Sequence, residues 1–523
     1  MMLPSEILQD HNLLYLSIFG GLALFLLAAV WNDLSDEIPY RRFPLVGKEW
    51  WDFSNKKARE RFTHSARALL AEGFAKGFAV FQVIGATNPV IILDPKYIDE
   101  IKNHPLLSFQ KAAQQSFFNN RIPGFEALHQ DHDALILVEA ARVKITQALG
   151  PLSIPLSTES AKSLKDIIVP SKEWTAYNFF QKSPHIVARV STLVFMGEKV
   201  CRDPAWLEVA VNYTIDTFQA GRDLRMWPSM LRPWVHWFLP SCRKTRQHHA
   251  IAKAIVSREI QARAERTQRQ LNGKVVSERP NALDWIDELS SAHGIQSDPL
   301  KVQLGLSVAA IHTTSNMLTH VMYDLAAYPE YCDPLREEIK AVLAEDGRLQ
   351  KSTLAKLKLL DSFIKESQRL NPVSITSLNR VATGPVELSD GTKIPRGATI
   401  AVSGHINFDE SIYPNASTFD GYRFYKLRQE PGHEHHHQLV TTTNKSFDFG
   451  HGVHACPGRF FAANEVKIIV IHLLLKYDWT FKDAQAGGRP KSLQIGVEVL
   501  ANPSVELLFR AREPEIDLAA LGE

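Results

Sequence analysis

A single cysteine near the carboxyl end of the chain, Cys456, lies in a glycine-rich stretch over residues 447–462, FDFGHGVHACPGRFFA. Glycines allow positive φ and a close approach of the backbone to a flat ligand, and Pro457 removes a competing N–H donor. Apolar residues recur at helical spacing over 459–476. We therefore predict that the sulfur lies near a helix N-terminus, where the positive end of the dipole favours a thiolate. Such a thiolate can serve as an axial ligand of haem iron.

The stretch has the form F-x-x-G-x-H-x-C-x-G, with Phe449, Gly452, His454 and Gly458 around Cys456. It closely resembles the haem-binding signature of the cytochrome P450 family. The resemblance implies haem b as cofactor, Cys456 as its metal ligand, and the other four residues in haem binding. The alternative is a buried, inert cysteine at a glycine turn, which is the usual state of a lone cysteine.

A second group of residues lies in the long helical pattern over residues 302–325. Ala309 and Ala310 leave room for a planar cofactor, and consecutive hydroxyl side chains in mid-helix are poor for helix propensity, which indicates a specific role. The segment resembles the oxygen-binding helix of the same family. The resemblance implies that the two alanines contact haem and that Thr313 hydrogen-bonds dioxygen and helps to deliver the protons that split it.

His312 stands where that family has an acidic residue. An imidazole can relay protons near neutral pH without a shifted pKa, so we include His312 among the catalytic candidates. The alternative is that His312 packs against a neighbouring helix. The substitution leaves any relay based on a carboxylic acid in doubt.

Glu366 and Arg369 have the i, i+3 spacing that puts both side chains on one face of a helix, where they can pair. Alone this pattern is weak and is usually a solvated face. Its place before Asn371-Pro372 is the one that the resemblance requires. The resemblance implies that the pair joins Arg423 to brace the haem-binding core. A buried ion network of this kind costs roughly 3–5 kcal/mol to break.

Two further arginines are candidates for the haem propionates. The family usually has W-x-x-x-R before the first of them, but Val138 replaces the tryptophan, so only Arg142 carries over. The alternative for Arg142 is an ordinary surface arginine. Arg380 lies where the family often supplies another propionate contact.

The predicted substrate pocket is apolar. The helix containing Thr313 resembles that of fungal family members of the ent-kaurene oxidase-like group, which oxidise diterpenes and related secondary metabolites. This resemblance implies a bulky lipophilic substrate, which an apolar pocket with few polar groups would bind. Besides Ala309, the candidate pocket residues are Phe117, Phe118, Phe125, Val373, Ile375 and Val497.

Composition excludes several other classes of protein. The 523 residues include 59 Lys and Arg against 57 Asp and Glu, so there is no bulk electrostatic case for binding nucleic acid. Four cysteines lie far apart without a C-x-x-C pair, which fits a reducing compartment and excludes a disulfide scaffold or a zinc ribbon. The histidine-rich segment 433–437 lacks the spacing of H-E-x-x-H, and we predict a solvated loop there.

The N-terminal region predicts a membrane anchor. Residues 13–31 carry no charge, just long enough for a helix to cross a bilayer. Arg41, Arg42 and Lys48 follow this run, so the positive-inside rule puts residues 1–12 in the lumen of the endoplasmic reticulum and the main domain in the cytoplasm. A cleaved signal peptide or a buried helix is the alternative. We predict a proline-rich hinge over 32–50 and a haem-thiolate catalytic domain over 51–523.

The remaining pattern predicts a mainly α fold with a small β region, as the family resemblance also implies. Strand-like runs at 79–84 and 89–93 flank a turn, residues 95–365 are mostly helical, and we expect a last hairpin over 493–509 that turns at Asn502-Pro503. The segment 227–240 is rich in aromatic residues, so either it contacts the membrane or it is a helix that buries them.

The resulting functional hypothesis is a monooxygenase that takes electrons from NADPH–cytochrome P450 reductase, with cytochrome b5 as a further donor, because the chain lacks a dinucleotide-binding motif. Basic residues expected on the docking face are Arg142, Lys144, Arg459 and Lys467. Two alternatives stay open: a haem-thiolate isomerase or dehydratase that needs no O2, and a non-catalytic haem-binding membrane protein.

Overall fold

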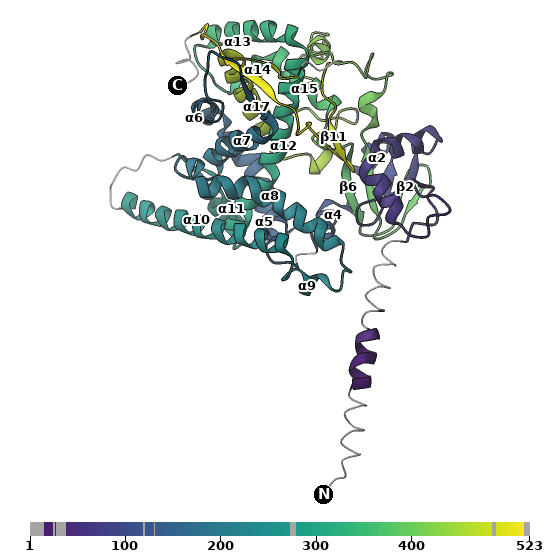
Figure 1. The fold of residues 1–523 in the computed structure, drawn as a ribbon. Coiled ribbons are helices and arrows are strands. Elements are labelled where there is room, and N and C mark those ends of the chain that lie inside the picture. Colours follow the sequence, from purple (N-terminus) through teal and green to yellow (C-terminus); the bar gives the residue numbers. More distant parts are fainter. Residues whose placement is uncertain are drawn as a thin grey trace.

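The structure is a computed structural model that describes residues 15–24, 27, 38–118, 121–129, 131–271, 279–483 and 488–516. Its body is mainly helical, and a smaller region of strands lies to one side (Figure 1). This agrees with the predicted fold class.

The helices of the body are distributed along the whole described chain. In order they are α2 (Lys56–Ala75), α3 (Ile98–Ile101), α4 (Phe109–Ser116), α5 (His132–Glu139), α6 (Thr146–Ile167), α7 (Phe179–Met196), α8 (Pro204–Arg225), α9 (Arg232–Val235), α10 (Pro240–Leu271), α11 (Ala282–His293), α12 (Pro299–Ala327), α13 (Cys332–Asp346), α14 (Lys351–Lys356), α15 (Lys358–Leu370), α16 (Arg423–Leu427) and α17 (Arg459–Lys476). A π-helical turn, Ala140–Ile145, connects α5 to α6.

The strands are short and form four sheets, of which the largest has the order β1-β2-β3-β9-β6-β4. The others are β10-β13-β5 and the pairs β11-β12 and β7-β8. Their bounds are β1 (Leu45–Val46), β2 (Val80–Ile84), β3 (Pro89–Leu93), β4 (Leu107–Ser108), β5 (Thr175–Tyr177), β6 (Thr376–Ala382), β7 (Val386–Glu387), β8 (Lys393–Ile394), β9 (Thr399–Ser403), β10 (Tyr477–Phe481), β11 (Leu493–Ile495), β12 (Glu498–Leu500) and β13 (Leu507–Ala511).

Helix α12 runs through the body and begins where its sequence predicts a start. The side chain of Asp298 accepts a hydrogen bond from the N–H of Leu300, and Pro299 occupies the first helical position, where a missing N–H costs nothing. Its 29 residues include the predicted 302–325. At 1.5 Å per residue they span roughly 44 Å, so one helix reaches from the site to distant parts of the core.

The main hydrophobic core gathers around α12 and α17. Val466, Ile469 and Leu473 of α17 are fully buried, as are Leu318 and Val321 of α12. Helix α17 is apolar on nearly all sides, which is typical of a helix at the centre of a large domain. The predicted helix over 459–476 has the same bounds in the structure.

The last hairpin differs from the prediction. It consists of β11 and β12 and turns at Gly496-Val497, where Gly496 has a φ of 58°. Strand β13, which was expected to complete this hairpin, pairs with β10 and β5 instead. The reason is burial: Leu507 and Phe509 are 0% and 2% exposed and belong to the main core, which β13 reaches only beside β10.

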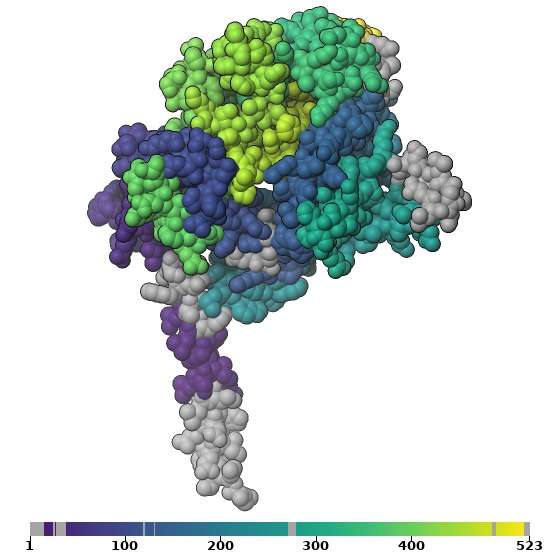
Figure 2. Space-filling model, turned by 180° about the vertical axis from the view of Figure 1, so that it is seen from behind, coloured from purple at the N-terminus to yellow at the C-terminus, as the bar shows by residue number. Residues whose placement is uncertain are grey.

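The predicted anchor over residues 13–31 is described in part. Residues 15–24 form a helix that projects from the body (Figure 1, Figure 2), while residues 1–14, 25, 26 and 28–37 lie outside the described residues. Within the described ranges, no helix is both long and apolar enough to cross a membrane.

Candidate active site

Cys456 lies in a tight loop that ends where α17 begins. Its N–H donates to the carbonyl of Phe449 at 2.7 Å, and the N–H of Ala455 donates to the carbonyl of Gly452 at 3.0 Å. Arg459, the first residue of α17, donates from Nη1 to the carbonyl of Cys456 at 2.9 Å. Backbone groups on both sides of the cysteine are thus bonded, which fixes the position of the sulfur.

Two glycines make this loop possible. Gly450 and Gly452 have φ values of 68° and 78°, in the left-handed region that favours glycine. A Cβ on Gly452 would lie 2.6 Å from Oδ1 of Asn103 and 2.8 Å from the carbonyl of Lys102. Gly452 is therefore required by a close approach to the neighbouring chain.

The thiol of Cys456 is subject to two opposing influences. Burial raises its pKa, and the backbone N–H groups of Gly458 and Arg459 act in the opposite direction. The helix N-terminus therefore acts to lower the pKa of the thiol, but burial has the larger influence and raises it. As a ligand of haem iron, Cys456 would be held as the thiolate, because a coordinating thiol loses its proton.

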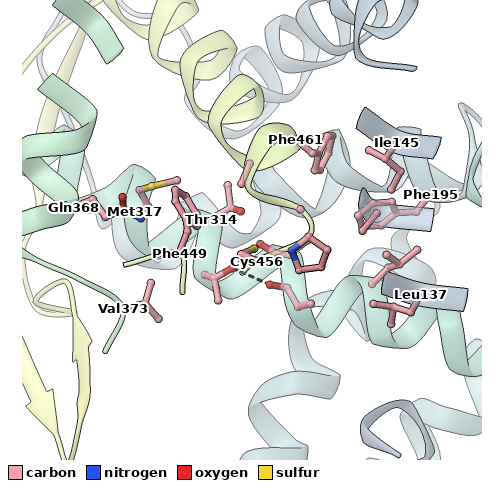
Figure 3. A pocket seen from close by; sticks show the side chains of 18 residues that line it. Leu137, Ile145, Phe195, Thr314, Met317, Gln368, Val373, Phe449, Cys456 and Phe461 are labelled. Carbon is pink, nitrogen blue, oxygen red and sulfur yellow. Dashed lines mark hydrogen bonds between the residues drawn. The ribbon is translucent and has the colours of Figure 1, made fainter. Parts of the chain in front are cut away.

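A cavity of about 120 Å³ lies beside Cys456 (Figure 3). One wall comes from α12 and consists of Leu306, Ala309, Ala310, Thr313, Thr314 and Met317. The cysteine loop and α17 contribute Phe449, Cys456, Pro457, Gly458, Phe461 and Ala462. The remaining wall consists of Leu137, Ala141, Ile145, Phe195, Gln368 and Val373.

Ala309 and Thr313 are exposed to this cavity although most of their helix is buried. Four residues apart, they lie on one face of α12. The hydroxyl of Thr313 donates to the carbonyls of Ala309 at 2.8 Å and Ala310 at 3.3 Å. Its oxygen lone pairs stay available, so the hydroxyl can accept a hydrogen bond from a ligand, or donate one after a rotation about χ1.

The imidazole of His312 contacts α8. Its Nε2 lies 2.8 Å from the carbonyl oxygen of Val211, and burial lowers the pKa of the ring. His312 does not line the cavity. A neutral ring that donates to a backbone carbonyl ties the two helices together, which is the packing alternative, and we assign no proton relay to it.

Glu366, Arg369 and Arg423 form a buried ion network. Arg369 donates to Glu366 through Nε at 2.8 Å and Nη2 at 2.7 Å. Nε of Arg423 lies 3.1 and 3.2 Å from the two carboxylate oxygens. Arg423 also donates to the carbonyl of Pro414 at 2.7 Å, and Arg369 donates to that of Asn407. The network thus joins α15 to two segments that precede the cysteine loop in the sequence.

A group of cationic and imidazole side chains lies beside the cysteine loop. Arg142 donates to the carbonyl of Val453 at 3.0 Å. Arg380 is 3% exposed and donates to the carbonyl of Asn379 at 2.7 Å, while its Nε has no partner among the described residues. Burial lowers the pKa of Arg380 to about 10. Burial, together with the charges of Arg380 and Arg142, lowers the pKa of His454.

Val373 is the member of the predicted substrate-pocket set that lines this cavity, together with Ala309. The other predicted residues do not line it. They are Phe117, Phe118, Phe125, Ile375 and Val497.

These five residues are used in packing elsewhere. The rings of Phe118 and Phe125 meet edge to face at 5.4 Å between centroids, and Phe117 packs against the same cluster. Ile375 is 6% exposed and, with Val497, belongs to the cluster around β2 and α2. The prediction relied on apolar character, which does not distinguish a cavity wall from a core.

Lys467 was wrongly predicted to belong to a docking face. It is 5% exposed, and its Nζ pairs with Oδ1 of Asp361 at 2.6 Å. A lysine buried in an ion pair on α17 cannot meet a partner protein. Of the other residues expected there, Arg142 is exposed and Lys144 pairs with Glu288 at 2.6 Å.

Sequence reasoning missed several residues of the cavity wall. Leu306 and Met317 lie at helical spacing from Ala309 and Thr313, so the period of α12 could have identified them. Gln368 offered no such signal, because it lies between Glu366 and Arg369 in a motif that predicts structural residues.

The residues present fit a haem. Cys456 supplies a sulfur ligand on the cavity wall, and a Cβ added at Gly458 would meet nothing within 4 Å. A buried guanidinium without a carboxylate needs an anion, and a haem propionate is one; Arg380, with its unpartnered Nε, would hold it together with Arg142. When bound, haem supplies the activation of dioxygen. The protein binds and orients the substrate, excludes water, and holds the Thr313 hydroxyl at the cavity surface.

A thiolate-ligated haem beside a hydroxyl-bearing helix is the chemistry of haem-thiolate oxygenases. The family model described as Cytochrome P450 matches residues 47–507. The chain belongs to the cytochrome P450 family, and it is a monooxygenase with haem b as cofactor.

Curated relatives carry the same description. The chain is 39% identical to cytochrome P450 monooxygenase calE of Penicillium decumbens over 497 residues, which cover 94% of this chain and 95% of the relative. It is 39% identical to cytochrome P450 monooxygenase adrA of Penicillium rubens over 515 residues, 97% of each chain. It is 41% identical to cytochrome P450 monooxygenase 1 of Gibberella fujikuroi over 443 residues, 83% of this chain and 98% of the relative.

Proposed function

We propose that this monooxygenase inserts one oxygen atom from O2 into a bulky lipophilic substrate, a terpenoid or a related secondary metabolite of a biosynthetic pathway. The main support for this substrate class is the cavity wall, whose side chains are apolar except for Thr313, Thr314, Gln368 and Cys456. Such a wall binds by burying apolar surface, at about 25 cal/mol per Å². Among the described residues, the wall offers no charged group with which an ionic substrate could pair.

The relatives support a monooxygenase, and the family resemblance supports the substrate class. The relatives are fungal enzymes named as cytochrome P450 monooxygenases, and the helix around Thr313 resembles that of the ent-kaurene oxidase-like group. This resemblance points to the oxidation of a hydrocarbon skeleton. Site and number of oxidations are to be read from the products.

We also propose that residues 13–31 anchor the protein in the endoplasmic reticulum membrane, with 1–12 lumenal, 32–50 as hinge and 51–523 in the cytoplasm. Exposed aromatic side chains around α9 support membrane contact: Trp234 is 57%, Trp237 58% and Phe238 84% exposed. Electrons would come from NADPH–cytochrome P450 reductase, with cytochrome b5 as a further donor. Arg142, Lys144 and Arg459 are the remaining candidates for the docking face.

The test is a reconstitution of the purified enzyme with the reductase. We expect a ferrous–CO band at the position typical of thiolate ligation, and NADPH-dependent oxidation of ent-kaurene as probe. Mass spectrometry after co-expression with neighbouring biosynthetic genes would then identify the natural product. Turnover without NADPH would favour an isomerase or dehydratase, and a CO band with no oxidation of any pathway compound would favour a non-catalytic haem protein.

A further inference from the structure

The side chain of Asn316 joins α12 to the last hairpin. Asn316 follows Thr313 by three residues and is 5% exposed. Its Nδ2 donates to the carbonyl of Val499 at 2.9 Å, and its Oδ1 accepts from the N–H of Ala501 at 2.9 Å. Both ends of the amide are therefore bonded to the backbone of one strand.

The same strand binds the segment that contains Val373. The N–H of Ile375 donates to the carbonyl of Val497 at 2.8 Å, and the N–H of Val499 donates to the carbonyl of Val373 at 3.1 Å. Alternate residues of an antiparallel strand bond to the same neighbour. The segment 373–375 thus occupies one edge of β12.

Asn316 continues this edge. Val497, Val499 and Ala501 alternate along β12 and the residues that flank it, and their backbone groups point to the same side. Residues 373–375 bond to the carbonyl of Val497 and the N–H of Val499. The amide of Asn316 bonds to the carbonyl of Val499 and the N–H of Ala501. A side-chain amide carries one acceptor and N–H donors, so here it takes the place of the next peptide group of the neighbouring segment.

This arrangement fixes two parts of the cavity wall relative to each other. Val373 lines the cavity, and so do Ala309 and Thr313 of α12. A continuous path of hydrogen bonds runs from Val373 through Val499 to Asn316, one helical turn from Thr313. The position of the Val373 side chain relative to the α12 face therefore depends on the amide.

We propose that Asn316 is a positioning residue for the reaction: it sets the space between Val373 and the Thr313 face, and so selects which large ligands fit there. Asn316 needs no contact with the ligand for this role. The inference rests on the proposed function in one respect, that the cavity beside Cys456 receives the substrate.

Tyr323 provides a matched control on the same helix. Its hydroxyl donates to the carbonyl of Asn502 at 3.0 Å, and Tyr323 does not line the cavity. Tyr323→Phe therefore removes one bond between α12 and the segment after β12, but it leaves both hydrogen bonds of Asn316 and those between 373–375 and 497–499 in place.

The test titrates the full-length, haem-containing enzyme with two azole probes by difference spectroscopy. Imidazole reaches only the metal, whereas clotrimazole also fills the substrate space. Asn316→Leu, of similar size but without hydrogen bonds, is expected to weaken clotrimazole binding by about fivefold or more and to leave imidazole binding and the ferrous–CO band unchanged. Asn316→Ser is the second variant, because a water molecule can replace the lost partners and preserve folding.

Tyr323→Phe is expected to change neither affinity. Equal weakening of both probes in the Asn316 variants would show a general effect on the haem site and overturn the proposal. Unchanged clotrimazole binding in both variants would overturn it as well. Failure of the proposed function has a different signature: the unaltered enzyme would itself bind clotrimazole no better than imidazole.

Discussion

Thr313 is a polar residue that the fold leaves at a cavity surface although most of its helix is buried. Its hydroxyl is held by the carbonyl of Ala309, one turn earlier, which orients the oxygen toward the cavity. A bond of this kind slightly destabilises a helix. The position of the hydroxyl beside the wall that contains Cys456 therefore argues for a role in proton delivery.

Replacing this hydroxyl separates oxygen consumption from product formation. We expect Thr313→Ala to form at least about tenfold less product per NADPH, because a positioned proton donor contributes of this order or more, and to release hydrogen peroxide instead. Thr313→Ser keeps the hydroxyl and is the matched control. An unchanged ratio of product to NADPH in the alanine variant would contradict the assignment.

Glu465 on α17 is a buried acid that serves no part of the site. It is fully buried, accepts a hydrogen bond from Ser191 at 2.7 Å, and has no partner for Oε2 within the described residues. Burial raises its pKa from 4.5 to about 8. The folded protein thus keeps a proton that the unfolded chain loses, so stability falls as the pH rises from about 4.5 to about 8.

Glu465→Gln removes this dependence. We expect the variant to be more stable than the unaltered protein near pH 8, by a few kcal/mol at about 1.4 kcal/mol per pKa unit, and equally stable near the lower end of the range. Apparent melting temperatures of both proteins, measured across this pH range, test the expected difference in stability. Glu513→Gln, at a side chain that is 91% exposed, is the control. Parallel pH profiles for the Glu465 variant and the unaltered protein would contradict the expectation.

Single residues were predictable where their type restricts the chemistry. Cys456 was proposed from residue type and spacing, Thr313 was implied by the family resemblance, and both line one cavity. The orientation of His312 was not predictable, because it depends on how α12 packs against α8, and a helical pattern does not specify its neighbours. Arg142 shows a related limit, since its contact with Val453 bridges segments far apart in the chain.

At the scale of elements, α15 acts as the connector between the haem-binding loop region and the core. Glu366 and Arg369 are 0% and 1% exposed, and their network reaches the segment around Arg423. Removing one partner from such a network leaves an uncompensated buried charge. The network therefore stabilises the arrangement of elements and takes no part in the chemistry.

The cost of breaking this network can be measured against that of breaking a surface ion pair made by the same helix, α16. Arg423→Gln is expected to destabilise the protein by roughly 3–5 kcal/mol and to reduce its haem content. Lys426 pairs with Asp420 at 3.2 Å, but its side chain is 66% exposed, so Lys426→Gln is expected to cost less than about 1 kcal/mol. Thermal unfolding and the yield of the ferrous–CO complex check both values. Equal effects of the two substitutions would contradict a structural role for Arg423.

Elements were predictable where local sequence specifies both ends. Pro457-Gly458 precedes α17 and the apolar period continues to its last residue, so its bounds agree with the prediction. The prediction of the last hairpin was wrong because the sequence contains two possible turns, at Gly496 and at Asn502-Pro503. Core burial of β13 decides between them, and that is a tertiary effect. The prediction that Lys467 belongs to a docking face was wrong for a similar reason, since most of its helix is buried.

At the scale of the whole molecule, exposed aromatic side chains and the N-terminal segment lie at the same end. Helix α9 is at the lower end of the body in Figure 1, and residues 15–24 lie below the body on the same side. Met226 and Phe238, on either side of α9, are each 84% exposed. Exposed apolar clusters of this kind mark interaction sites, and tryptophan favours the interface between lipid and water.

A chain that lacks residues 1–37 tests whether this end contacts lipid without the anchor. We expect it to bind phosphatidylcholine vesicles in a flotation assay, and the combined change Trp234→Ser, Trp237→Ser and Phe238→Ser to weaken binding at least tenfold, because burying one such side chain contributes roughly 1.5–3 kcal/mol. Trp174→Ser is the matched control, since Trp174 is 42% exposed and directly precedes β5, which pairs with β13. Equal binding of the truncated chain with and without the triple change would show that α9 does not contact lipid. Membrane attachment would then depend on residues 13–31 alone, and the aromatic side chains would need another partner.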